Sequence, residues 1–299
     1  MSEKRENRVV EKQKNKIPVV WTIGASDSSG GSGIQADLLT FNDFLVHGCT
    51  AITALNAQNS FALGNISPTS GESFAAQISA LEYDMPANSI KLGMMPNLEI
   101  ARMVNEYLEE YTGFVVYDLE LDNCGKAFLG EAKDLVTTTL FKRVDLVIAN
   151  TEEVDVLSGI NVCSTDTMVS AARYFLELGA RSVLITGARI VRDQSAAQNS
   201  TKENGVRFDY WSDGTTSFWL QFKTVATVNN QSGGCALSAA VAAMMGGNSE
   251  LKEAITQAKA YVTKGIRGAR QIGNGPGTVA HLGLSDDPED MPQVLETIE

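Results

Sequence analysis

Short apolar segments alternate with amphipathic segments along most of the chain. Runs rich in β-branched residues have the length of buried strands, at 17–24, 49–55, 89–94, 113–118, 144–149 and 181–186. Apolar residues recur at helical spacing elsewhere, which predicts helices over 33–46, 72–84, 97–111, 166–178, 235–245 and 249–268. The strand segments are apolar nearly throughout, as in a parallel sheet covered by helices on both faces. The pattern therefore predicts an α/β fold with a mostly parallel central sheet flanked by helices.

This alternation ends after residue 190. Residues 191–205 are polar and rich in turn formers, which suggests a flap over a bound nucleotide. Two strand-like segments then flank Asp213-Gly214, a hairpin signal that predicts a few antiparallel strands at the edge of the sheet. No repeat or linker divides the chain. We expect a flexible N-terminal arm (1–16), a single domain (17–284) and a peripheral acidic C-terminal tail (285–299).

Charge and composition restrict the partners. The chain has 299 residues, 43% of them hydrophobic, and a net charge of −12. No apolar run approaches the ~18 residues of a membrane span, and the first sixteen residues do not read as a secretory signal. An acidic chain without a basic stripe repels nucleic acid and anionic lipid. We therefore expect a cytoplasmic protein with a small-molecule partner, no nucleic acid and no membrane.

The cysteines show no metal-binding spacing. They are Cys49, Cys124, Cys163 and Cys235, and His47 and His281 are the only histidines. A zinc site is therefore not expected, and scattered thiols without a secretory signal suggest a reducing cytoplasm. Cys49 and Cys163 are interpreted as small buried apolar residues.

A first glycine-rich turn, GASDSSGGSGIQADLLTF (24–41), follows the first predicted strand. Its G-x-G-x-x-A match to dinucleotide folds lacks the acidic residue expected at the end of the second strand, and it is not a Walker A loop. Asp37 and Gln58 are expected at the carboxyl ends of neighbouring strands, where they could read the edge of a polar heterocycle. Alternatively, Asp37 complements the helix dipole.

A second glycine turn, QSGGCALSAAVAA (231–243), opens a predicted helix. The N–H groups of Gly233, Gly234 and Cys235 would lack partners there and would attract an anion such as a transferring phosphoryl group. The helix dipole is expected to lower the pKa of the Cys235 thiol and make it a better base. Alternatively, the two glycines only allow close packing.

Asn150 and Glu153 follow the strand at 144–149 with N-x-x-E spacing. An amide and a carboxylate on the first turn of a helix can hold Mg²⁺ through its water ligands. The same spacing also occurs in a plain helix cap.

Taken together, these motifs resemble the ribokinase-like superfamily, and most closely the hydroxymethylpyrimidine/phosphomethylpyrimidine kinases of thiamine biosynthesis. The similarity is strongest in the first glycine turn, continues in ITALNAQN (52–59) and IKLGMM (90–95), and resumes at N-x-x-E, GGCALSAAVAA and GNGP (273–276). It implies a three-layer ribokinase-like fold, often homodimeric. It also implies phosphorylation of a pyrimidine hydroxymethyl group, and then of its monophosphate, with ATP and Mg²⁺.

The resemblance also implies roles for individual residues. The pyrimidine pocket would be lined by Ala25, Asp37, Asn56, Gln58 and Met94. The nucleotide and its phosphates would contact Asn150, Thr186, Gly187, Arg189 and Gly233, and the metal would be held by Asp118 and Glu153. The catalytic anion hole would consist of Gly233, Gly234 and Cys235, with the cysteine where sugar-kinase relatives carry an aspartate.

Two segments differ from the family pattern. In 115–126, Glu120 replaces an apolar pocket residue and Lys126 is the nearest stand-in for a lysine. In 185–189, Arg189 takes the place of a phosphate-facing cation, and a guanidinium binds phosphate well. Two alternatives therefore stay open: a pyridoxal kinase, and a degenerate ribokinase fold that binds a pyrimidine or nucleotide with little turnover.

Overall fold

The computed structural model describes residues 17–120, 135–188 and 205–296. Its strands are β1 (Val19–Asp27), β2 (His47–Gln58), β3 (Leu63–Pro68), β4 (Ser89–Leu92), β5 (Phe114–Asp118), β6 (Leu146–Asn150), β7 (Val183–Ala188), β8 (Val206–Ser212), β9 (Ser217–Lys223) and β10 (Gln293–Leu295). Its helices are α2 (Gly33–Asp43), α3 (Gly71–Asp84), α4 (Leu98–Tyr107), α6 (Thr151–Ser158), α7 (Thr165–Glu177), α8 (Gly233–Gly246) and α9 (Leu251–Gly268), with the 3-10 helix η1 (Leu140–Arg143). The sequence expectations for 1–16, Cys124, Lys126, Arg189 and 191–204 lie outside the described residues.

In the described part of the chain, the strands form one ten-stranded sheet in the order β10-β9-β8-β7-β6-β5-β4-β1-β2-β3. The central strands β7, β6, β5, β4, β1 and β2 run parallel to one another. At the edges, β3 pairs antiparallel with β2, and β8, β9 and β10 form antiparallel pairs next to β7. The predicted α/β fold with a mostly parallel sheet and antiparallel edge strands is thus confirmed.

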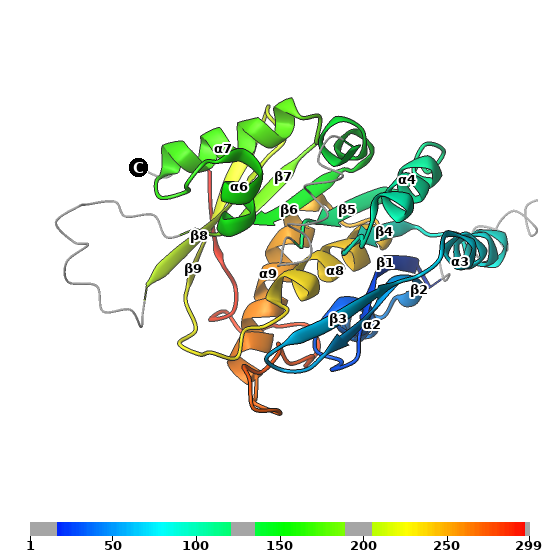
Figure 1. Ribbon diagram of the computed structural model, residues 1–299. Coiled ribbons are helices and arrows are strands. Elements are labelled where there is room, and N and C mark those ends of the chain that lie inside the picture. The colour runs from blue at the N-terminus through cyan, green and yellow to red at the C-terminus, as the bar shows by residue number, and fades with distance from the viewer. Residues whose placement is uncertain (1–16, 121–134, 189–204, 297–299) are drawn as a thin grey trace, which may run out of the picture.

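Helices cover both faces of the sheet, which makes three layers (Figure 1). One face packs against α3, α4, α6 and α7, and the other against α2, α8 and α9. Alternate residues of β5 enter the two cores, since Val115 and Tyr117 face one layer and Val116 faces the other. Both faces are therefore buried, which explains why the parallel strands read as continuous apolar runs.

The carboxyl ends of the parallel strands meet at one edge of the sheet, and the strand register is interrupted three times near it. The pairing of β2 with β3 shifts between Ala57 and Gln58. The pairing of β1 with β2 shifts between Gly24 and Ser26, around Ala25. The pairing of β7 with β8 shifts between Ile185 and Ala188. Such irregularities redirect side chains next to functional sites.

Two strands were not predicted. In β3, the sequence LGNISP contains glycine, asparagine and proline and is exposed along much of its length, so it lacks the usual strand pattern. The other, β10, lies in the acidic tail and pairs with β9. Arg267 of α9 also forms ion pairs with Asp287 and Asp290 of this tail. Residues 285–296 are therefore packed against the domain.

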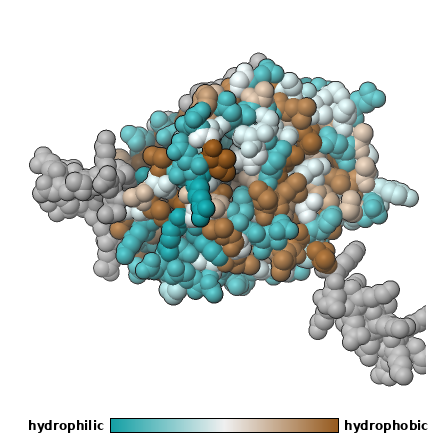
Figure 2. All heavy atoms as spheres, turned by 90° about the horizontal axis from the view of Figure 1, so that it is seen from below, coloured by the Kyte–Doolittle hydropathy of each residue, from teal (hydrophilic) through white to brown (hydrophobic). Residues whose placement is uncertain are grey.

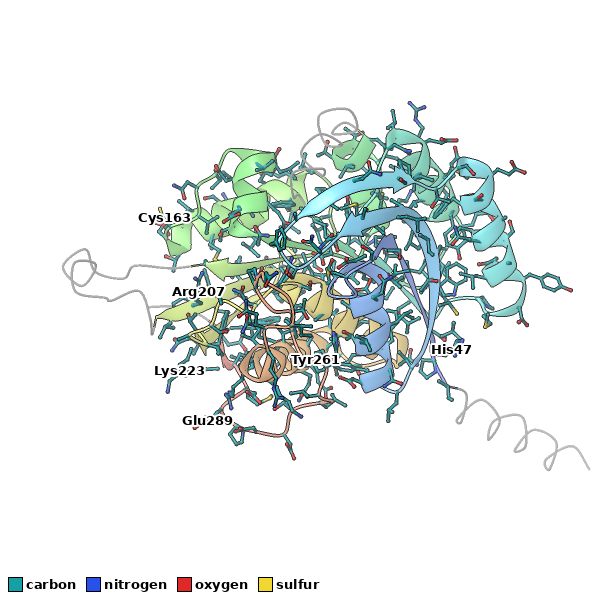
Figure 3. The ribbon with its side chains drawn as sticks, turned by 60° about the horizontal axis from the view of Figure 1, so that its bottom comes forward. His47, Cys163, Arg207, Lys223, Tyr261 and Glu289 are labelled. Carbon is teal, nitrogen blue, oxygen red and sulfur yellow. The ribbon has the colours of Figure 1, made fainter. Side chains whose placement is uncertain are left out.

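The prediction that Cys163 is buried was wrong, whereas Cys49 is buried as expected. Cys163 lies in the connection before α7, at the periphery of the molecule (Figure 3), where it is exposed. On the face seen in Figure 2, apolar side chains are scattered among polar ones. Within the described residues, no helix combines the length and the apolar character that crossing a membrane requires.

Candidate active site

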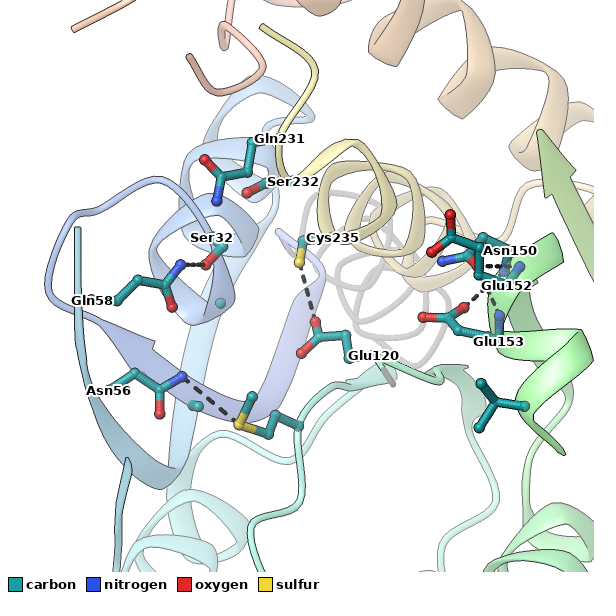
Figure 4. A pocket seen from close by; sticks show the side chains of 14 residues that line it. Ser32, Asn56, Gln58, Glu120, Asn150, Glu152, Glu153, Gln231, Ser232 and Cys235 are labelled. Atoms are coloured by element: carbon teal, nitrogen blue, oxygen red, sulfur yellow. Dashed lines mark hydrogen bonds between the residues drawn. The ribbon is translucent and has the colours of Figure 1, made fainter. Parts of the chain in front are cut away.

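A pocket of about 330 Å³ opens at the carboxyl edge of the sheet, between the turn after β1, the end of β2 and the start of α8 (Figure 4). We call it the first pocket. Of the residues expected around a pyrimidine, it is lined by Ala25, Asn56, Gln58 and Met94. Gly33 and Cys235 also line it, so the two glycine-rich turns lie on the same pocket.

The first glycine turn is held tightly against β1. Gly33 has φ +57°, and a Cβ there would lie 2.3 Å from the carbonyl oxygen of Ala25. Asp27, which sequence reasoning did not single out, is buried, and its Oδ2 accepts hydrogen bonds from the N–H and the hydroxyl of Ser32, both at 2.8 Å. These contacts hold the first glycine turn, which forms one side of the first pocket, in place.

Asp37 is not among the residues that line the first pocket. It is fully buried, and its Oδ2 accepts hydrogen bonds from Thr22 at 2.6 Å and from Lys91 Nζ at 3.1 Å. Helix α2 has no acidic residue in its first turn, so the helix-dipole interpretation of Asp37 was wrong. Its direct contact with a substrate stays a prediction, and the structure shows it fixing Lys91.

Lys91 joins Asp37 to Glu120. Its Nζ lies 3.2 Å from Oε1 of Glu120, and the lysine is 1% exposed. Burial lowers the pKa of Lys91, but the two carboxylates outweigh it, so the pKa lies well above its ordinary value and the ammonium stays charged. Lys91 was not singled out from the sequence, and Glu120 was noted only as a departure from the family pattern, because only the fold brings β4, α2 and the end of β5 together.

Cys235 donates a hydrogen bond from its thiol to Oε1 of Glu120, at 3.1 Å (Figure 4). The expectation of a lowered thiol pKa was wrong. Burial, and then the neighbouring Glu120 carboxylate, raise the pKa of Cys235 well above its usual value. Desolvation and a like charge therefore outweigh the helix dipole, and the group at the start of α8 is a neutral thiol.

Asp118, at the end of β5, lies directly beneath the start of α8. Both of its carboxylate oxygens lie 3.7 Å from the position of a Cβ on Gly234, and Oδ2 accepts a 2.9 Å hydrogen bond from Ser238. Burial, and then Glu120, raise the pKa of Asp118 well above its ordinary value. Within the described residues, one ligand atom each of Asp118, Glu120 and Cys235 lie within 4.8 Å of one another.

Asn150 and Glu153 form a capping box at the start of α6. The side chain of Asn150 accepts from the N–H of Glu153 at 2.9 Å, and Oε2 of Glu153 accepts from the N–H of Asn150 at 2.8 Å. The helix-cap interpretation is therefore confirmed. Both residues also line the first pocket, together with Glu152, so the cap places two carboxylates on its wall.

The start of α8 has no side-chain cap. Ser232 occupies the N-cap position with φ +65°, a left-handed conformation that non-glycine residues rarely adopt. Its hydroxyl oxygen and Oε1 of Gln231 are buried without a hydrogen-bond partner among the described residues, and both residues line the first pocket. The first N–H groups of α8 and these side chains are thus available to a ligand.

A second pocket, of about 300 Å³, lies on the other side of the α8 start. It is lined by Gly233, Gly234, Thr186 and Gly187, and their contact with phosphates stays a prediction. Gly187 has φ +78°, and its N–H donates to Asp209 at 2.7 Å.

The second pocket also contains cations that the sequence reasoning missed: Arg207, Lys223 and Lys259. Arg207 and Lys223 lie close together on the neighbouring strands β8 and β9 (Figure 3). Lys259 pairs with the buried Asp209 at 2.7 Å. Nothing in the sequence indicated that these cations share a pocket, because they come from two strands and from a helix that is distant in the sequence.

The fold and the arrangement of this site place the chain among the ribokinase-like kinases. Pyridoxal kinase from Staphylococcus aureus, in complex with AMP-PCP and pyridoxal, superimposes with a TM-score of 0.79 at 26% identity, over 94% of this chain and 98% of that one. Phosphomethylpyrimidine kinase from Clostridium difficile has a TM-score of 0.67 at 28% identity, over 84% and 100% of the two chains.

The family model for phosphomethylpyrimidine kinase matches residues 27–280, and the chain belongs to that family. Among curated relatives, the hydroxymethylpyrimidine/phosphomethylpyrimidine kinase of Synechococcus elongatus is 33% identical over 268 residues, which is 89% of this chain and 98% of that protein. The resemblance stated from the sequence is thereby confirmed, and the chain is a phosphotransferase of this family.

Proposed function

We propose that the chain transfers the γ-phosphoryl group of ATP to the hydroxymethyl group of 4-amino-5-hydroxymethyl-2-methylpyrimidine, and then to the resulting monophosphate. The observation that carries this proposal is the position of the α8 start. Ser232 and Cys235 face the first pocket, while Gly233 and Gly234 face the second. An acceptor in one pocket and a triphosphate in the other would meet at these unpaired N–H groups.

In the proposed reaction, the hydroxyl oxygen bonds to the γ-phosphorus, the bond to the β,γ-bridging oxygen breaks, and ADP leaves. The hydroxyl proton passes to solvent water, because the neutral Cys235 thiol donates a hydrogen bond and does not remove that proton. The N–H groups of Gly233, Gly234 and Cys235 stabilise the charge on the transferring group. Positioning and charge stabilisation supply most of the catalysis in phosphoryl transfer.

The second pocket fits a nucleotide triphosphate. Arg207, Lys223 and Lys259 supply positive charge, and Gly233 and Gly234 allow phosphate oxygens to approach the main chain. AMP-PCP is bound in the Staphylococcus aureus relative, which supports ATP as the donor here.

The carboxylates around the α8 start fit Mg²⁺, a hard cation that prefers oxygen ligands. We assign Asp118 and Glu153 to it. The raised pKa of the buried Asp118 indicates a carboxylate that a nearby cation would stabilise in its charged form. When bound, Mg²⁺ neutralises phosphate charge.

The test is direct. Purified protein with Mg·ATP and the hydroxymethylpyrimidine is expected to release ADP and to form mono- and diphosphate products, separable by anion-exchange chromatography. ATP consumption at background level, together with a rise in melting temperature on adding the pyrimidine, would instead favour a binding protein.

Pyridoxal is the second candidate substrate, because the Staphylococcus aureus pyridoxal kinase superimposes with the higher TM-score of the two structures compared. A comparison of kcat/KM for pyridoxal and for the hydroxymethylpyrimidine distinguishes the two candidate substrates. A larger value for pyridoxal would replace the first proposal. A homodimer and a cytoplasmic location remain part of the proposal, and sedimentation and cell fractionation test them.

A further inference from the structure

Glu120 places a carboxylate at the point that the phosphoryl acceptor must reach. It lies just beyond the end of β5 with φ +31°, a value unusual for a residue with a side chain, and it lines the first pocket. Its Oε1 accepts the hydrogen bond of the Cys235 thiol at 3.1 Å. Any acceptor group that approaches the start of α8 from the first pocket therefore also approaches Glu120.

Gly93 makes room for this arrangement. A Cβ at Gly93 would lie 2.8 Å from Nζ of Lys91 and 3.3 Å from Oε1 of Glu120. A side chain at position 93 would therefore crowd both Lys91 and Glu120, and glycine leaves room for their ion pair.

The charge around this position is negative. Of the residues that the structure describes, Lys91 is the ammonium group that pairs with Glu120, and it also pairs with Asp37, so there two carboxylates face one cation. Glu152 and Glu153 also line the first pocket. Among the described residues that line it, none is a lysine or an arginine. The cations of the second pocket lie on the other side of the α8 start.

The two successive acceptors of the proposed function differ in charge at this point. The acceptor of the first step is a neutral hydroxyl group, which can donate a hydrogen bond to a carboxylate. The acceptor of the second step is a phosphate monoester that carries about −1.5 to −2 charges near pH 7. Two anions a few ångströms apart in a partly buried site repel each other strongly.

We propose that Glu120 makes the site selective for the neutral alcohol and against its monophosphate. The alcohol is then the preferred acceptor, and the second transfer, to the monophosphate, is the slower of the two steps. This inference rests on the proposed function and specifies which of the two acceptors that site prefers.

The test compares kcat/KM for the alcohol and for the monophosphate in the wild-type chain, Glu120→Gln and Glu120→Asp. Glu120→Gln removes the charge and keeps the shape, and it is expected to shift the ratio toward the monophosphate by about tenfold or more. Glu120→Asp keeps the charge and is expected to retain the wild-type preference. Glu110→Gln makes the same charge change at an exposed position before β5, at the other end of the sheet. The ratio should stay at its wild-type value in that control.

Ionic strength gives an independent readout. Added salt screens charge repulsion, so the wild-type ratio is expected to narrow between low salt and ~0.5 M, and the ratio of Glu120→Gln should change less. An unchanged ratio in Glu120→Gln, or an equal loss of both activities, would overturn the proposal, because Glu120 would then serve both steps alike. If the wild-type chain phosphorylates neither compound, the proposed function fails. The dissociation constants of the two compounds for the wild-type chain and Glu120→Gln, from calorimetry, then decide the selectivity by themselves.

Discussion

At the scale of single residues, the ion pairs next to the first pocket depend on the buried ammonium group of Lys91. Lys91→Met would leave Asp37, which is fully buried, without its cation. We expect a loss of about 3–5 kcal/mol in the free energy of unfolding, measured by urea denaturation, because an unpaired buried charge is costly. Lys252→Met is the matched control. It removes the exposed ion pair with Glu296 and should cost less than about 1 kcal/mol.

Lys91 also gives the stability a pH dependence. Its pKa is raised in the folded state, so its stabilising effect is complete below the pKa of the unfolded chain, about 10.4 for lysine, and is lost as the pH rises above it. Melting temperatures of the wild-type chain should therefore fall above about pH 10, with a smaller fall in Lys91→Met. Equal falls in both would show that Lys91 is not the responsible group.

The cysteines should differ sharply in reactivity. Cys163 is exposed, whereas Cys49 and Cys235 are buried and burial raises the pKa of both thiols. Iodoacetamide at pH 8, followed by peptide mass mapping, should label Cys163 at least about tenfold faster than Cys235, because the thiolate is the reactive form. Rapid labelling of Cys235 would instead indicate the lowered pKa that helix-dipole reasoning predicts.

At the scale of elements, the start of α8 acts through its bare backbone. In Gly234→Asp, the new carboxylate would lie against Asp118, 3.7 Å from the added Cβ, and would oppose any anion bound there. A loss in kcat of at least about 100-fold is expected, comparable to removing an oxyanion-hole donor. Gly234→Ala adds a methyl group in ordinary van der Waals contact, so it should cost much less. Similar losses in the two variants would contradict the electrostatic role, and melting temperatures of both report on folding.

At the scale of the whole molecule, the acidic tail protects the edge of the sheet. A chain that ends at residue 284 would lose β10 and expose the edge of β9. It would also remove Asp287 and Asp290, which pair with Arg267. We expect a melting temperature several degrees lower and a stronger tendency to aggregate, measured by differential scanning calorimetry and light scattering. A truncated chain as stable as the full chain would show that the tail contributes nothing.

Individual residues show how far the sequence could be read. The parallel strands, the hairpin around Asp213-Gly214 and the two glycine turns follow from local patterns, and the structure brings those turns together on one pocket. Strands β3 and β10 were not predicted, because their stability comes from pairing with a neighbouring strand. The positions of Arg207 and Lys259 in the second pocket were not predicted, because a single charged residue in a strand or helix forms no local sequence pattern.

The sequence by itself determined the layered α/β architecture, the position of the uncapped helix start and the resemblance to one kinase family, because periodicity, glycine placement and motif spacing are properties of consecutive residues. The tertiary structure alone decided the electrostatics of the site. It buried Asp37 and paired it with Lys91. It also placed Glu120 next to the Cys235 thiol, so the pKa of that thiol is raised and not lowered as expected. Desolvation and charge pairing depend on which distant segments meet, and no local pattern records that.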